Sequence, residues 1–154
     1  MTGPVEIHWQ RLAMQAQGLL SVSTNRVANA ANLSAFIYQE MPDISWVGFY
    51  FLHGDTLVLG PFQGKPACVN IAMGEGVCGT AAASGEICRV ADVDAFEGHI
   101  ACDADSRSEL VIPLIKNGAL LGVLDVDSTR LDRFSGQDEA GIAELATVYL
   151  ASVV

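Results

Sequence analysis

The sequence feature that most constrains the fold is a pair of strongly apolar segments joined by a short glycine turn. Residues 109–115 and 119–127 flank Lys116-Asn117-Gly118 and are long enough for β-strands. Asn-Gly is typical of tight hairpin turns, and glycine accepts the left-handed backbone that such turns need. The pattern therefore predicts an antiparallel hairpin.

Two loop lengths are compatible with this hairpin. A two-residue turn would place Glu109 opposite Val126, whereas a three-residue loop would place it opposite Asp125. Opposite residues share a face of the sheet. The three-residue loop keeps every carboxylate off the face that carries the leucines, so we predict that register. In this register, one face carries Leu110, Ile112, Leu114, Leu120, Gly122 and Leu124.

The remaining segments extend the hairpin into an α+β layout with a mainly antiparallel sheet. No linker or repeat interrupts the chain, so we expect one domain over residues 1–154. We predict helices over about 6–19, 24–39 (with Ser23 or Thr24 as N-cap), 80–84 and 136–154, and further strands over 45–53, 56–62, 67–72 and 87–91. The polar stretch 92–106 is long for a connection, and long ordered loops often carry sites.

Composition excludes several classes of function. The formal net charge is −10, with only 8 lysines and arginines, which argues against nucleic acid and against a polybasic membrane contact. No stretch has the length of apolar residues that a membrane span needs, and the first ten residues lack an apolar signal core. We therefore expect a cytoplasmic protein whose four cysteines are mostly reduced.

Three of the four cysteines occur in turns or polar loops. Cys78 lies between glycines at a predicted helix start, where the helix dipole lowers a thiol pKa. Cys102 lies in the polar loop, and Cys68 lies at the start of the predicted strand 67–72, just after Gly64 and Pro66. A single cysteine is more often a small buried apolar residue, which is our interpretation of Cys88, but three together indicate a thiol site.

Carboxylates and aromatic residues suggest a small-molecule pocket. Glu109, Asp125 and Asp127 share one face at one end of the hairpin, either as a solvated sheet edge or as a binding site for a cation. A proton shared among them would supply a general acid. Trp46 and Tyr50 point to one face of their strand and flank Gly48, which leaves room for a ligand.

The sequence offers no set of metal ligands. His99 is a possible base or ligand, but His8 and His53 are far from it in the chain. The cysteines are spaced more widely than in zinc ribbons or in thioredoxin-like CxxC pairs. The Gly74–Gly79 pattern resembles a dinucleotide fingerprint but lacks a βαβ frame, so we expect no metal and no organic cofactor.

Six segments, spread over nearly the whole chain, resemble the free methionine-(R)-sulfoxide reductases, a family built on the GAF domain. These segments are Trp46–Tyr50, Gly60–Cys68, Gly76–Ala81, Gly98–Asp103, Ser108–Glu109 and Gly122–Ser128. The spacing of Cys68, Cys78 and Cys102 distinguishes this family from GAF domains that bind cyclic nucleotides or chromophores. The resemblance implies a six-stranded antiparallel sheet covered by helices on both sides.

The resemblance also implies the chemistry and the site. Cys102 is the nucleophile, either Cys68 or Cys78 resolves, and the substrate is free methionine-(R)-sulfoxide. Trp46, Tyr50, Glu109, Asp125 and Asp127 line the substrate site. The family is often dimeric and draws electrons from thioredoxin, which fits a role against oxidative stress.

The chain departs from the family pattern at two positions. Asn70 and Glu75 stand where the family commonly has basic residues, which affects either a thiol pKa or the docking of a reductant. The main alternative function is a GAF-type sensor that binds a small ligand, or responds to redox state, without catalysis. A purely structural dimerisation module is a second alternative.

Overall fold

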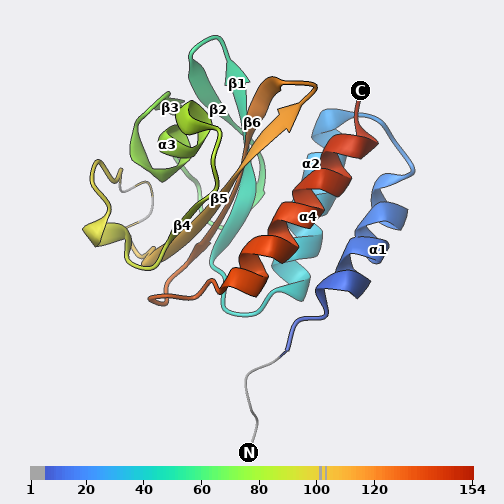
Figure 1. Cartoon of the computed structure of the whole chain (residues 1–154), viewed down its shortest axis with the longest axis horizontal. Coiled ribbons are helices and arrows are strands. Elements are labelled where there is room, and N and C mark those ends of the chain that lie inside the picture. Colours follow the sequence, from blue (N-terminus) through green and yellow to red (C-terminus); the bar gives the residue numbers. More distant parts are fainter. Residues whose placement is uncertain (1–5, 101, 103) are drawn as a thin grey trace, which may run out of the picture.

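The residues that the structure describes form four α-helices and one sheet (Figure 1). The computed structural model describes residues 6–100, 102 and 104–154. The helices are α1 (Trp9–Leu20), α2 (Arg26–Glu40), α3 (Gly76–Ser84) and α4 (Gly136–Ser152), and a single 3₁₀ turn, η1, spans Val93–Ala95. The strands are β1 (Trp46–His53), β2 (Thr56–Gln63), β3 (Asn70–Ala72), β4 (Cys88–Val90), β5 (Ser108–Lys116) and β6 (Ala119–Ser128).

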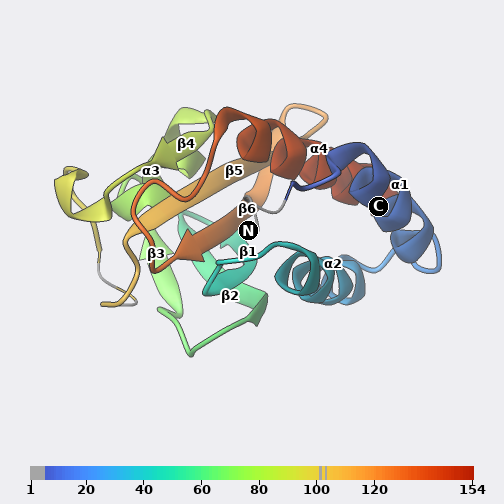
Figure 2. The same ribbon diagram turned by 90° about the horizontal axis from the view of Figure 1, so that it is seen from below.

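The six strands form one sheet in the order β3-β2-β1-β6-β5-β4, and every neighbouring pair is antiparallel. Figures 1 and 2 show α1, α2 and α4 packed on one face, while α3 lies on the other. The α+β architecture with helices on both sides of an antiparallel sheet is confirmed. None of the described helices has the length and apolarity that crossing a bilayer requires.

The alternation along β1 divides the apolar residues between two cores. Val47 and Phe49 are fully buried in the larger core, which α1, α2 and α4 cover. Trp46 and Tyr50 point the other way, into the smaller core beneath α3. The predicted division of this strand between two faces is confirmed, and it places both rings on the α3 side.

The hairpin between β5 and β6 corrects the predicted loop. Asn117 and Gly118 both have positive φ (53° and 78°) and Lys116 pairs with Ala119, so the turn has two residues. The three-residue loop was wrong. A register shift next to Ile115, a β-bulge that leaves Leu121 without an opposite residue, then moves the remaining pairs by one position.

Because of the bulge, the residues of β5 and β6 lie on the same faces of the sheet as in the predicted register. Glu109 pairs with Asp127, Leu110 with Val126 and Val111 with Asp125. Each partner is two residues further along than predicted, which leaves each residue on its predicted face because side chains alternate with period two. The three carboxylates therefore share the α3 face.

Several element boundaries differ from the predictions for local reasons. Asn25 caps α2, because its side chain accepts hydrogen bonds from the Val27 and Ala28 amides, so Ser23 and Thr24 lie outside the helix. Helix α3 begins at Gly76 instead of residue 80, which places Cys78 inside its first turn. Strand β3 has three residues, so Cys68 lies in the preceding loop instead of in a strand.

Candidate functional site

A pocket with a cavity of about 50 Å³ lies between α3 and the sheet face that carries the carboxylates. Seven of the eight site residues predicted from sequence line it: Trp46, Tyr50, Cys78, Cys102, Glu109, Asp125 and Asp127. The eighth, Cys68, is bonded to Cys102. The fold thus gathers residues from β1, α3, β5, β6 and the loop after η1 around one small space.

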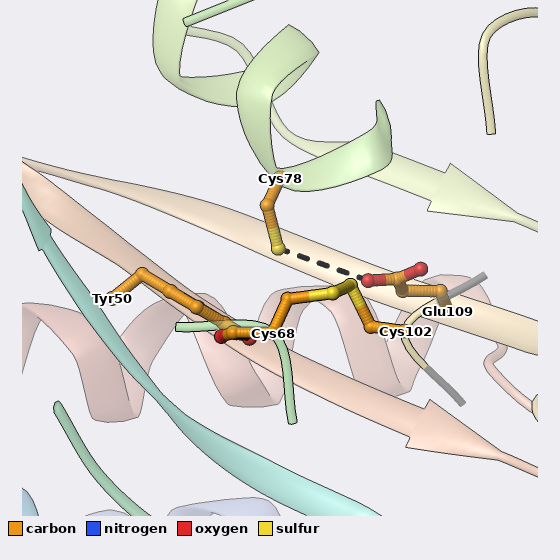
Figure 3. Close-up of a disulfide and its surroundings, with 5 residues drawn as sticks. All are labelled: Tyr50, Cys68, Cys78, Cys102 and Glu109. Carbon is orange, nitrogen blue, oxygen red and sulfur yellow. Dashed lines mark hydrogen bonds between the residues drawn. A yellow bond between two sulfur atoms is a disulfide. The ribbon is translucent and has the colours of Figure 1, made fainter. Parts of the chain in front are cut away.

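Two sulfur atoms at this pocket form a disulfide. Cys68 and Cys102 are joined with a Cα–Cα distance of 5.3 Å, although 34 residues separate them in sequence. Figure 3 shows the disulfide beside Tyr50 and Glu109. Cys78 and Cys88 remain thiols. Of the two possible partners for Cys102, the structure therefore pairs it with Cys68.

Cys78 behaves differently from the sequence prediction. Its side chain is buried, and its thiol lies 3.8 Å from Glu109 Oε2, toward which it points (Figure 3). Burial raises the pKa of this thiol well above its ordinary value, and the charges of Asp125 and Glu109 add to the rise. The predicted lowering by the helix dipole is wrong, because desolvation and neighbouring carboxylates outweigh a partial charge at a helix end.

The three carboxylates form a buried acidic cluster. Glu109, Asp125 and Asp127 expose only 8%, 4% and 9% of their surface, so the solvated-edge interpretation is excluded. Burial raises the pKa of Glu109 well above its ordinary value, followed by the charge of Asp125. Burial also raises the pKa of Asp125, followed by the charge of Asp127. Carboxyl groups in such surroundings hold a proton near neutral pH or attract a cation.

The described pocket wall contains unused hydrogen-bonding capacity. No lysine or arginine is among the residues described as lining it. Within the described residues, Asp125 Oδ1 and Ser106 Oγ are buried without a hydrogen-bond partner. Ser106 is 8% exposed and was missed from sequence, since a serine in a polar loop gives no signal of burial. A ligand with a positive charge and polar atoms would satisfy these groups.

Trp46 and Tyr50 anchor the opposite wall to the loop that carries Cys68. The Trp46 indole N–H donates to the Lys65 carbonyl oxygen over 3.0 Å, and the Tyr50 hydroxyl donates to the Cys68 carbonyl oxygen over 3.0 Å. Burial raises the pKa of Tyr50, so its hydroxyl stays a donor. The backbone before the disulfide is thereby held against β1.

The space above Gly48 is not the ligand site. A Cβ there would lie 2.3 Å from the Phe62 Cβ and 2.8 Å from the Trp46 ring, so these side chains occupy the gap expected from sequence. Trp46 stacks on Phe62 with ring centroids 5.3 Å apart. Gly48 instead leaves room for the Trp46 ring, which also lines the pocket.

Comparison with known proteins identifies the family. Residues 16–151 match the GAF domain family. The chain is 54% identical over 127 residues to a free methionine-R-sulfoxide reductase of Escherichia coli, covering 82% of this chain and 77% of that protein. The structure of the reduced form of fRMsr of Staphylococcus aureus matches with a TM-score of 0.95 at 41% identity, covering 100% of both chains. The free methionine-R-sulfoxide reductase of Neisseria meningitidis, in complex with its substrate, matches with a TM-score of 0.92 at 39% identity, covering 99% of this chain and 92% of that one.

The chain belongs to the free methionine-(R)-sulfoxide reductase family. Membership of this family makes it an oxidoreductase, and the sequence-based recognition is confirmed. The GAF fold expected from the resemblance is confirmed as well. The six matching segments and the spacing of the three cysteines were sufficient to find the family.

The two residues that depart from the family pattern, Asn70 and Glu75, differ in their position relative to the pocket. Glu75 precedes α3 and lines the pocket, whereas Asn70 is exposed on β3 and is absent from the described pocket wall. His99 also lines the pocket and is partly buried. Glu75 therefore adds a further acidic group at the wall of this reductase, beyond the three that the sequence pattern indicated.

The arrangement brings together three chemical capacities. The Cys68–Cys102 disulfide accepts two electrons when it is reduced to two thiols, and the thiols give up two electrons when the disulfide forms again. Burial raises the pKa values of Glu109 and Asp125, so a carboxyl group of this pair can donate a proton. The acidic cluster favours a cationic or zwitterionic ligand. In addition, Cys78 Sγ and one oxygen each of Glu109 and Asp125 lie within 4.8 Å of one another.

Proposed function

We propose that this enzyme reduces free L-methionine-(R)-sulfoxide to L-methionine by thiol chemistry. The observation that carries the proposal is the Cys68–Cys102 disulfide at the wall of a pocket with three buried carboxylates. The names of the Escherichia coli and Neisseria meningitidis relatives support the choice of substrate. Neither a metal nor an organic cofactor enters this chemistry.

Substrate recognition follows from charge. A free amino acid carries an ammonium group, and the buried carboxyl group of Asp125 has no lysine or arginine beside it among the described residues of the pocket wall. Pairing with the ammonium offsets the cost of burying the Asp125 carboxylate. Trp46 and Tyr50 hold the S-methyl group, because both aromatic side chains line the pocket. A methionine residue inside a protein lacks the ammonium and binds less well.

The first chemical step transfers the sulfoxide oxygen. The Cys102 thiolate attacks the substrate sulfur while a protonated carboxyl group, Glu109 or Asp125, donates a proton to the sulfoxide oxygen. Methionine leaves with its sulfur reduced, and the oxygen remains on Cys102 as a sulfenic acid. The raised pKa of both carboxyl groups supports this role, since an acid must hold its proton near neutral pH.

The second step closes the disulfide. The thiol of Cys68 attacks the sulfenic sulfur of Cys102, a disulfide forms and the oxygen leaves as water. An external dithiol of the thioredoxin class then exchanges with this disulfide and returns both thiols, becoming oxidised itself. The observed pairing of Cys68 with Cys102 supports Cys68 as the resolving residue over Cys78.

The biological setting completes the proposal. The chain acts in the cytoplasm as a single GAF domain over residues 1–154, as a homodimer, and returns oxidised free methionine to use under oxidative stress. The net charge of −10 supports a small zwitterionic substrate over nucleic acid or anionic membrane.

A coupled assay tests the reaction. The protein is given free L-methionine-R-sulfoxide, and separately the S epimer, with thioredoxin, thioredoxin reductase and NADPH. We expect NADPH loss with the R epimer alone. Loss with neither epimer, also with a chemical dithiol in place of thioredoxin, would overturn the proposal and favour the sensor. A native thiol count distinguishes the two functions, since only the enzyme loses two thiols per chain on meeting the sulfoxide.

A further inference from the structure

The substrate pocket contains three side chains that together could bind a metal ion, a role that the proposed reaction does not require. Cys78 Sγ, a Glu109 oxygen and an Asp125 oxygen all lie within 4.8 Å of one another, and all three residues are buried. They come from α3, β5 and β6, so their spacing in the sequence does not indicate a metal site. One thiol and two carboxylates are a ligand combination that zinc accepts.

We propose that Zn²⁺ binds at Cys78, Glu109 and Asp125 and inhibits the enzyme by occupying the site of the substrate ammonium. Binding of the metal is independent of the reaction. The competition with substrate rests on the proposed function. The ion acts here as an inhibitor and not as a cofactor.

The geometry suits a zinc ion. Cys78 Sγ and Glu109 Oε2 are 3.8 Å apart. Zinc–sulfur and zinc–oxygen bonds of about 2.3 and 2.1 Å at a tetrahedral angle place the two ligand atoms about 3.6 Å apart. The observed pair therefore needs only a small inward movement. Three protein ligands leave a fourth position, and the cavity of about 50 Å³ has room for a water molecule there.

Unsatisfied polar atoms in the pocket independently indicate a missing ligand. Among the described residues, Asp125 Oδ1 has no hydrogen-bond partner although the residue is only 4% exposed. Ser106 Oγ is buried at the same pocket, also without a partner in the described part of the chain. A metal ion with a bound water would engage both, the first as a ligand and the second through the water.

The donor chemistry selects the metal. A thiolate ligand favours zinc and cadmium over magnesium and calcium, which prefer oxygen ligands alone. Binding replaces the thiol proton of Cys78, and any proton that Glu109 or Asp125 carries, by the metal, and these protons go to solvent. Cys78 lies outside the disulfide, so the ligand set is complete in the oxidised enzyme.

Cobalt titration of the oxidised protein tests the site directly. A Cys88→Ser background leaves Cys78 as the one thiol of the oxidised chain, so a thiolate-to-cobalt charge-transfer band reports Cys78 alone. We expect this band to appear, to be abolished by Zn²⁺ and to survive Mg²⁺. Adding Cys78→Ser should remove the band. No band in the Cys88→Ser protein, or a band that persists in the double variant, would overturn the proposal.

Two further measurements separate the metal site from a folding effect and from the reaction. Asp125→Asn keeps the thiol and should weaken cobalt binding at least about 10-fold, a loss typical even of groups that only support a ligand. Unchanged cobalt affinity in this variant would overturn the ligand assignment. Excess L-methionine-(R)-sulfoxide should displace cobalt, and a band that withstands it would overturn the competition. If the protein shows the Cys78-dependent band but fails the coupled assay, the proposed reaction is refuted and the metal site is retained.

Discussion

The Tyr50 hydroxyl donates a hydrogen bond to the Cys68 carbonyl oxygen over 3.0 Å, joining the central strand β1 to the loop that holds one sulfur of the disulfide. A second buried tyrosine makes a similar bond elsewhere: the Tyr149 hydroxyl donates to the Arg26 carbonyl oxygen over 2.9 Å, in the core on the opposite face of the sheet. The two tyrosines form a matched pair for experiment.

Tyr50→Phe should slow disulfide formation about fivefold. The lost hydrogen bond helps to hold Cys68 near Cys102, and its removal costs about 1 kcal/mol. The measurement is the rate of thiol loss after mixing the reduced enzyme with one equivalent of the R-sulfoxide. Tyr149→Phe should lower the free energy of unfolding by a similar amount and leave that rate unchanged. Equal slowing in both variants would show a general stability effect and contradict the positioning role of Tyr50.

Cys68→Ser and Cys78→Ser should separate the two candidate resolving thiols. Without Cys68, the enzyme should release one methionine per chain and then stop with Cys102 as a sulfenic acid, which a dimedone label followed by mass spectrometry detects. Cys78→Ser should still form the disulfide and turn over with thioredoxin, because Cys78 is unbonded and its raised pKa makes it a poor nucleophile. Cys88→Ser is the control, and a sulfenic acid that accumulates in Cys78→Ser would reverse the assignment.

Glu109→Gln should stabilise the protein at alkaline pH while removing activity. Because burial raises the pKa of Glu109, the folded protein holds a proton that the unfolded chain has lost. Stability from this group is complete below the ordinary carboxyl pKa of about 4.3 and declines as pH rises through the raised value. Urea unfolding of the oxidised protein at pH 5 and at pH 8 measures this effect. The unfolding free energy should fall less from pH 5 to pH 8 in the variant than in the unmodified protein. An equal or steeper loss would contradict a protonated Glu109.

Gly122→Ala should be among the most damaging single changes in the sheet. Its Cβ would lie 1.9 Å from the Tyr50 carbonyl oxygen, so β1 and β6 would have to separate beside the pocket. We expect a loss of about 3 kcal/mol in unfolding free energy, as overpacking against backbone produces. Gly136→Ala, with no atom within 4 Å of the new Cβ, is the control and should gain about 0.5 kcal/mol. Thermal unfolding measures both, and equal stability of the two variants would refute the close approach.

The hairpin shows how much of the site the sequence could predict. Alternation along β5 and β6 correctly placed Glu109, Asp125 and Asp127 on one face, because a face depends only on whether a shift is odd or even. The pairing itself was wrong, since the two-residue turn and the bulge beside Leu121 change the register in ways that the apolar pattern does not record. The face was predictable from the alternation of residue types along the strands, whereas the register depended on local backbone geometry.

Properties that depend on neighbours in three dimensions could not be predicted from the sequence pattern. The helix start at Cys78 indicated a lowered thiol pKa, but the opposing carboxylates come from strands more than 30 residues away. Gly48 indicated an open space that Phe62, from the next strand, fills. Ser106 gave no signal because burial of a loop serine depends on what α3 and the sheet place around it.

The Cys68–Cys102 bond also acts on the unfolded chain. A crosslink that closes a loop of this length, with its ends 34 residues apart, removes enough freedom from the unfolded ensemble to favour the folded state by about 4 kcal/mol. The redox state of the site therefore sets resistance to unfolding and, under the proposed function, readiness for reaction. A cell depleted of reductant would accumulate the enzyme in its idle form, and that form is the one best protected against heat and proteolysis.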